Sequence, residues 1–237
     1  TGGKVMMAWE TSILRFLQGP LALLTLSVFL AGLIGQGVRL WRRTNAALPP
    51  RLKAAADSRD PANGGLRRRW ARFLARLRTT APGSSPVLAA VSLVFHVCLF
   101  VVPLGIGGHI VLLESTLGTA LPALSDRMAD LLTLFVLAGG LFFLLRRVLV
   151  RRVRVITSWN NVVLLLLALL PFATGILAHH HLVLRYNLMI MLHMVSAELL
   201  LVLIPFSKFF HMIFFFFGRF LIVNEYSLGR PRRVWQS

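Results

Sequence analysis

The sequence predicts an all-α membrane protein, a bundle of five transmembrane helices with the N-terminus outside and the C-terminus in the cytoplasm. Of its 237 residues 57% are hydrophobic, and the mean hydropathy is +0.74. The apolar residues form long blocks, whereas a soluble domain shows short alternations. A helix needs about 20 apolar residues to cross the hydrocarbon core. Five stretches approach or exceed this length: residues 16–40, 86–113, 128–145, 162–178 and 186–217.

The basic side chains determine the predicted orientation. A formal net charge of +18 would suggest a nucleic-acid partner in a soluble protein. Here the arginines gather in the link after the first span, in residues 146–154 after the third, and in the C-terminal tail. Cytoplasmic loops carry an excess of Lys and Arg, and five spans place all three segments on one side. We therefore expect a multi-pass protein of the inner (cytoplasmic) membrane, with no nucleic-acid partner.

Composition divides the chain into four parts. They are the N-terminus with the first span (1–43), a basic cytoplasmic link (44–85), a four-helix core (86–218) and a cytoplasmic tail (219–237). Within the link, Leu66, Trp70, Leu74 and Leu77 recur at helical spacing against a face of arginines. This pattern is typical of a basic interfacial helix. Such a helix either lies on anionic lipid or docks a cytoplasmic partner subunit.

Four of the seven histidines lie within predicted spans, His96 and His109 on the second and His193 and His211 on the fifth. A strongly polar side chain in hydrocarbon is unfavourable unless it pairs or ligates. One such histidine would suggest an interhelical hydrogen bond, but four on two helices favour a bound metal group. The single cysteine, Cys98, lies inside the second span, which excludes a CxxCH attachment site and an iron–sulfur cluster. Histidine or methionine must hold any iron.

The spacing of these histidines predicts how they pair. His193 and His211 are 18 residues apart, a whole number of helical turns, so on a continuous helix they share one face about 27 Å apart. The second and fifth spans are antiparallel, so His96 should face His211 near the cytoplasm and His109 should face His193 near the outside. The 13 residues between His96 and His109 put them on opposite faces of an ideal helix. The pairing therefore requires a bend or unwound turn within residues 103–108.

The segment LHMVSAELLLVLIPFSKFFHM, residues 192–212, resembles the last helix of the gamma subunit of respiratory nitrate reductase. Similar subunits are the membrane cytochromes b of sulfite-reduction-associated, transmembrane redox and heterodisulfide-reductase-like complexes. The resemblance covers most of the bundle: five spans, an outside N-terminus and histidines on the second and fifth helices. The long arginine-rich link and the spacing from His96 to His109 depart from the nitrate-reductase pattern, which favours one of the relatives.

The resemblance implies two haems b, one ligated by His96 with His211 and one by His109 with His193. Lys208 precedes His211 by three residues and lies on about the same helical face. It either hydrogen-bonds a haem propionate or extends to the cytoplasmic interface.

A subunit of this family transfers electrons between a membrane quinone, menaquinone or ubiquinone, and a cytoplasmic iron–sulfur subunit. It is an electron-transfer subunit of a respiratory oxidoreductase complex rather than a complete enzyme. Other membrane subunits or an extracytoplasmic multihaem cytochrome are further partners that the resemblance allows. The alternative is a non-haem membrane anchor or scaffold whose histidines make interhelical hydrogen bonds.

Other polar residues carry weaker expectations. Glu198 lies in the fifth span five residues after His193, and we expect it to make an interhelical contact or to belong to a proton path. The run from His179 to His181 falls in the outer loop after the fourth span. These histidines are either solvated or proton acceptors near a quinone.

Overall fold

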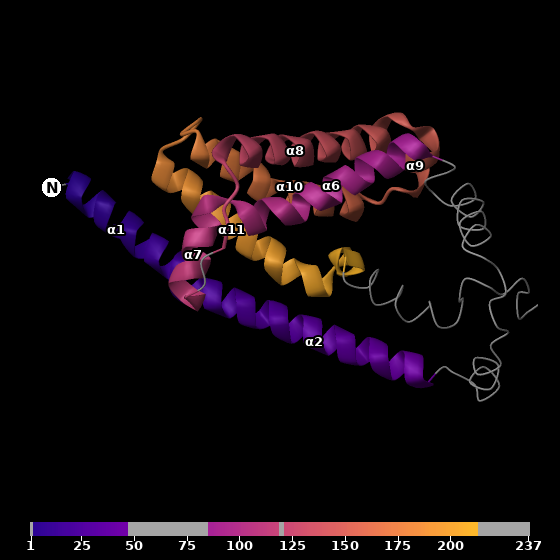
Figure 1. The fold of residues 1–237 in the computed structure, drawn as a ribbon, viewed down its shortest axis with the longest axis horizontal. Coiled ribbons are helices and arrows are strands. Elements are labelled where there is room, and N and C mark those ends of the chain that lie inside the picture. Colours follow the sequence, from indigo (N-terminus) through magenta and orange to yellow (C-terminus); the bar gives the residue numbers. More distant parts are fainter. Residues whose placement is uncertain (1, 47–84, 119–120, 213–237) are drawn as a thin grey trace, which may run out of the picture. The chain divides into compact units, whose positions relative to one another are not determined.

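The computed structural model describes residues 2–46, 85–118 and 121–212, which form helices and connecting segments without a strand (Figure 1). Five helices in this part of the chain are long and apolar enough to cross a membrane: Trp9–Arg42, Pro86–Gly105, Asp126–Leu149, Trp159–His179 and Tyr186–Phe206. This confirms the prediction of a multi-pass helical membrane protein. The expected interfacial helix around residues 64–78 and the tail at 219–237 lie outside the described residues.

The helices and helical turns follow in the order α1 (Gly2–Phe16), η1 (Leu17–Leu21), α2 (Ala22–Ala46), α6 (Pro86–Gly105), α7 (Gly107–Leu117), α8 (Asp126–Leu149), α9 (Arg151–Ile156), α10 (Trp159–His179), α11 (Tyr186–Phe206) and η2 (Lys208–Phe210). The first span begins earlier than predicted and contains the π-helical turn η1. Pro20 lies inside this turn. A proline has no N–H and its ring crowds the preceding turn, and a π-bulge absorbs this disturbance within an otherwise continuous helix.

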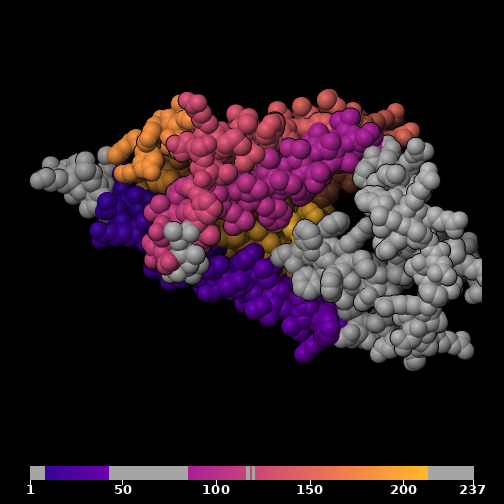
Figure 2. Space-filling view, viewed as in Figure 1, coloured from indigo at the N-terminus to yellow at the C-terminus, as the bar shows by residue number. Residues whose placement is uncertain are grey.

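The chain divides into two compact units, Thr1–Leu14 with Gly64–Ala197 and Arg15–Asn63 with Glu198–Ser237. In the first unit α8 packs against both α6 and α10 (Figure 1). Side chains of α6 and α8 lie against each other along one face (Figure 2). The core there consists of Phe95, Cys98, Val102, Val136 and Phe172. Cys98 is thus a small buried residue facing neighbouring helices.

Two glycines of α8 let the helices of the first unit approach closely. A Cβ added at Gly139 would lie 3.0 Å from Cδ2 of Phe95, and a Cβ at Gly140 would overlap the Leu169 side chain of α10. Helix packing in membranes depends on such small residues, because lipid tails compete equally well for apolar side chains and close van der Waals contact decides association. Glycine at these two positions therefore fixes how α6 and α10 pack on α8.

In the second unit, α2 contacts the end of α11. A Cβ added at Gly32 would lie 2.7 Å from Cγ of Pro205, and Gln36 Nε2 donates a hydrogen bond to the Pro205 carbonyl at 3.0 Å. Pro205 itself is fully buried. The glycine thus provides the room and the glutamine the polar contact for this packing.

The second span is interrupted where the sequence predicts it. α6 ends at Gly105, Ile106 is extended (φ −65°, ψ 132°), and α7 begins at Gly107. The break leaves carbonyl groups at the end of α6 without helical partners, and Gly105 O accepts the N–H of Leu124 at 2.8 Å. His109 therefore lies on the short helix α7 and not on a continuation of α6.

The fifth span differs from the prediction. α11 ends at Phe206, Ser207 is extended (φ −122°, ψ −173°), and a separate 3-10 turn, η2, follows. The expectation of one continuous helix that carries His193 and His211 in phase is therefore wrong. Ser207 Oγ accepts the N–H of Phe209 at 3.2 Å, so this side chain caps the new turn and competes with continuation of the helix.

Candidate functional site

The rings of His109 and His193 face each other within the first unit. Their centroids are 5.9 Å apart and their planes differ by 18°. His109 lies on α7 and His193 on α11, two helices that are far apart along the chain. The structure thus brings together the two histidines that the antiparallel argument places near the outer side.

The end of α6 positions His109. Its Nδ1 lies 2.8 Å from the carbonyl oxygen of Pro103. That carbonyl is in the last turn of α6, where the break at Ile106 removes the regular helical donors. The same interruption therefore turns His109 away from the α6 axis and supplies the acceptor that orients its ring.

Helix α10 positions His193. The Nδ1 atom lies 2.9 Å from the carbonyl oxygen of Pro171. Gly175 lies beside the ring, and a Cβ there would be 3.1 Å from Cε1 of His193. The ring thus occupies a space that exists only because residue 175 has no side chain.

Two buried hydroxyl groups complete the surroundings of His193, and the sequence analysis missed both. Thr174 Oγ1 is 3.5 Å from His193 Nδ1 and 3.2 Å from Ser196 Oγ. Ser196 Oγ donates to the carbonyl of His193 at 2.8 Å. Single Thr and Ser residues in apolar segments usually bond to their own helix, so only the contact between α10 and α11 reveals this network.

The remaining two span histidines belong to different units. His96 Nδ1 lies 2.6 Å from the Ser92 carbonyl, and its ring packs edge-on to Phe95. His211 Nδ1 lies 2.7 Å from the carbonyl of Lys208, the first residue of η2. His96 is in the first unit and His211 in the second, so their pairing and the role of Lys208 stay predictions.

All four histidines share one hydrogen-bonding pattern. In each, Nδ1 contacts a backbone carbonyl oxygen: Pro103 for His109, Pro171 for His193, Ser92 for His96 and Lys208 for His211. A carbonyl oxygen only accepts, so Nδ1 carries the proton and the lone pair of a neutral ring is on Nε2. Histidines that ligate metals commonly fix their tautomer by this kind of bond.

His109 and His193 would be the residues that hold one metal ion. Their ring centroids are 5.9 Å apart and the ring planes are nearly parallel. Both Nδ1 atoms contact carbonyl oxygens, so the free lone pair of each ring is on Nε2. Two histidine imidazoles are a ligand set suited to low-spin haem iron.

Glu198 does not make the expected interhelical contact through its Oε2 atom. Among the described residues, this oxygen is buried and has no hydrogen-bond partner.

A second acidic residue, Glu10, was not predicted from the sequence to have a role and is buried in the first unit. Its Oε2 accepts from Asn187 Nδ2 at 2.8 Å, and its Oε1 lies 3.3 Å from Arg185 Nη2. These two contacts of Glu10 connect α1 to the start of α11.

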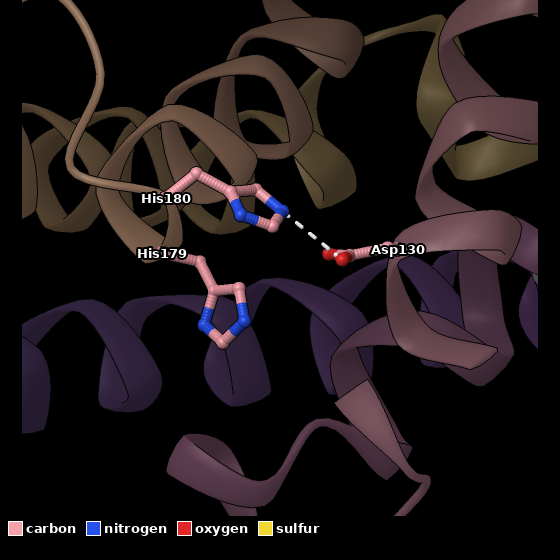
Figure 3. A group of neighbouring side chains, drawn as sticks. All are labelled: Asp130, His179 and His180. Atoms are coloured by element: carbon pink, nitrogen blue, oxygen red, sulfur yellow. Dashed lines mark hydrogen bonds and ion pairs between the residues drawn. The ribbon is translucent and has the colours of Figure 1, made fainter. Parts of the chain in front are cut away.

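The histidine run after the fourth span is exposed, as expected, but one member has a specific partner. His180 Nε2 lies 3.0 Å from Asp130 Oδ2, and Figure 3 shows this pair with His179 beside it. Asp130 falls in the second turn of α8, inside a predicted span. His181 instead contacts the ring of Tyr186, at a centroid distance of 5.0 Å.

Comparison with known proteins gives one informative similarity. No protein-family profile matches the chain, and no solved structure matches it. A protein of Nitratidesulfovibrio vulgaris (strain Hildenborough), described only as "Protein", is 30% identical over 220 residues, which cover 91% of this chain and 94% of the relative. The chain therefore belongs to the same family as this Nitratidesulfovibrio vulgaris protein.

Proposed function

We propose that the chain is a dihaem cytochrome b membrane subunit of a respiratory oxidoreductase complex, similar to the gamma subunit of nitrate reductase. The observation that carries this proposal is the pair of facing rings from His109 and His193, 5.9 Å apart. Their Nδ1 hydrogen bonds leave Nε2 as the ligating atom. Ligation by these two atoms would relieve the cost of placing two imidazoles at membrane depth.

Each histidine has a defined role in this proposal. His109 and His193 hold the outer haem b, and His96 and His211 hold the inner one. Lys208, the first residue of η2 and three residues before His211, would donate a hydrogen bond to a propionate of the inner haem. A bound haem b supplies one-electron transfer. The carbonyls of Pro103 and Pro171 keep the ligand rings oriented.

The proposed orientation follows from the basic groups. Arg146 and Arg147 lie in the last turn of α8, and the short helix α9 contains three more arginines, Arg151, Arg152 and Arg154. This excess of arginine supports assigning that end of the bundle to the cytoplasm, with the N-terminus outside and the C-terminus inside. The protein then resides in the inner membrane. In this proposal the outer haem would exchange electrons with menaquinone or ubiquinone, and an iron–sulfur subunit would dock at the cytoplasmic side.

A reduced-minus-oxidised spectrum of the purified protein tests the proposal. We expect b-type absorption and about two haems per chain by pyridine haemochrome assay. His109→Ala and His193→Ala should each reduce this to about one, because each removes an axial ligand of the same haem. His181→Ala, in the exposed run, should retain both. Full haem content in His109→Ala would refute the assignment of the outer pair.

A second candidate function, a non-haem anchor or scaffold, has one observation in its favour. The bond from His193 Nδ1 to Pro171 O joins α11 to α10, which is the interhelical hydrogen bond that this alternative expects. Folded protein with no haem signal, whose His193→Ala variant loses thermal stability, would support the anchor and exclude the dihaem subunit.

A further inference from the structure

A second cluster of ligand atoms lies at the ends of α8 and α10. One ligand atom each from Asp130, His179 and His180 lies within 4.8 Å of the others. Figure 3 shows both imidazoles beside each other, with the Asp130 carboxylate facing them. None of these residues contributes to the pair formed by His109 and His193.

The end of α10 explains why two consecutive histidines converge. Neighbouring residues on a helix point about 100° apart and do not face each other. α10 ends at His179, and His180 leaves the helix with φ −90° and ψ 7°. The two rings consequently approach to 4.9 Å between centroids. His180 Nε2 meets Asp130 Oδ2 at 3.0 Å, and a ring nitrogen of His179 lies within 4.8 Å of the other two ligand atoms.

We propose that Asp130, His179 and His180 bind a divalent transition-metal ion, with Zn²⁺ as the best match. Two imidazole nitrogens and one carboxylate oxygen are a common zinc set that leaves the fourth tetrahedral position for water or another ligand. Imidazole also disfavours Mg²⁺ and Ca²⁺, which prefer oxygen ligands. The carbonyl end of α10 adds partial negative charge that favours a cation.

The distances need little adjustment for such a site. Adjacent ligand atoms around a tetrahedral ion with bonds of about 2.0 Å are about 3.3 Å apart. His180 and Asp130 already meet at 3.0 Å. The three ligand atoms lie within 4.8 Å of one another. Rotation of the exposed His179 side chain is therefore enough to bring its ring nitrogen to the spacing of adjacent ligands around one ion. The exposure of both histidines gives an ion direct access.

Equilibrium dialysis of the full-length protein tests this site. Protein first treated with a chelator is dialysed against ZnCl₂, and bound zinc is measured by mass spectrometry. We expect one saturable zinc ion per chain. Asp130→Ala, His179→Ala and His180→Ala should each weaken binding by at least about tenfold, as is usual when a metal loses ligand support. His181→Ala is the matched control, a histidine of the same run outside the cluster, and should bind normally.

Two further measurements decide the outcome. Circular-dichroism melting shows that each variant is folded, so that a zinc loss in a folded variant supports the site. Competition with CaCl₂ should leave bound zinc unchanged. Wild-type protein that binds no zinc, ligand variants that bind as wild type, or equal displacement by Ca²⁺ would each overturn the proposal. The first of these results would show that His180 and Asp130 form an ion pair only.

Discussion

Gly175 controls the position of the His193 ring more directly than any polar group does. The ring is held between the Pro171 carbonyl, 2.9 Å from Nδ1, and the bare Cα of residue 175. A methyl group at residue 175 would lie 3.1 Å from Cε1 of His193, closer than an ordinary van der Waals contact. The ring could make room only by lengthening its hydrogen bond. The glycine thus helps to position the His193 ring, although it has no side-chain chemistry of its own.

We expect Gly175→Ala to lower the free energy of unfolding by about 1 kcal/mol, the usual net contribution of one hydrogen bond, and to reduce occupancy of the outer haem. Gly37→Ala, a helix position with nothing within 4 Å, should leave stability unchanged or slightly raised, because alanine favours helix. Thermal unfolding in detergent and haem content measure both effects. Equal melting temperatures for the two variants would contradict the steric argument.

At the scale of elements, helix ends rather than helix faces create the site. The break at Ile106 gives α7 its own direction and leaves the Pro103 carbonyl for His109. Proline and glycine in residues 103–108 signal this break in the sequence, because neither sustains a regular helix well. Before the break at Ser207 the sequence offers only Pro205, which permits a kink but does not determine where the helix ends. Capping by one serine hydroxyl does not alter hydropathy, and hydropathy defined the predicted span.

Gly105→Ala tests the junction between α6 and α7. A Cβ at this position would lie 2.7 Å from Cδ1 and 2.8 Å from Cγ of Leu124, whose N–H bonds to the Gly105 carbonyl. We expect a loss of about 1–3 kcal/mol of unfolding free energy, typical of overpacking, measured by thermal unfolding in detergent. Gly107→Ala, two residues on and with nothing within 4 Å, is the matched control. A loss of the same size in the control would show that backbone flexibility, and not the Leu124 contact, matters here.

At the scale of the whole molecule, the lengths of the apolar helices and the positions of the basic residues predict the membrane topology. Five helices of the described residues are long and apolar enough to cross a membrane, and the proposal assigns the basic groups at the end of α8 and in α9 to the cytoplasm. The segment between α10 and α11 should consequently face outside. In the proposed orientation the cluster of Asp130, His179 and His180 would lie at the outer surface, accessible to metal ions from the medium.

Cysteine labelling of intact cells checks this topology. In a Cys98→Ala background, Val183→Cys between α10 and α11 should react with a membrane-impermeant maleimide. Val155→Cys in α9 should react only after permeabilisation. Both positions are well exposed, at 80% and 78%, so accessibility of the side chain does not limit either reaction. Labelling of Val155→Cys in intact cells would reverse the proposed orientation. The Cys98→Ala parent has no cysteine, because Cys98 is the single cysteine of the sequence, and it reports the background labelling.

The sequence by itself determined the membrane class, the number of spans and the histidines worth testing, because hydropathy and charge act over whole segments and are read without knowing contacts. It also located the bend that brings His109 to His193. Only the tertiary structure decided which groups surround His193, that Asp130 joins His179 and His180, and that α11 stops before His211. These features depend on contacts between residues distant in the chain or on one capping hydroxyl, and neither leaves a periodic pattern in the sequence.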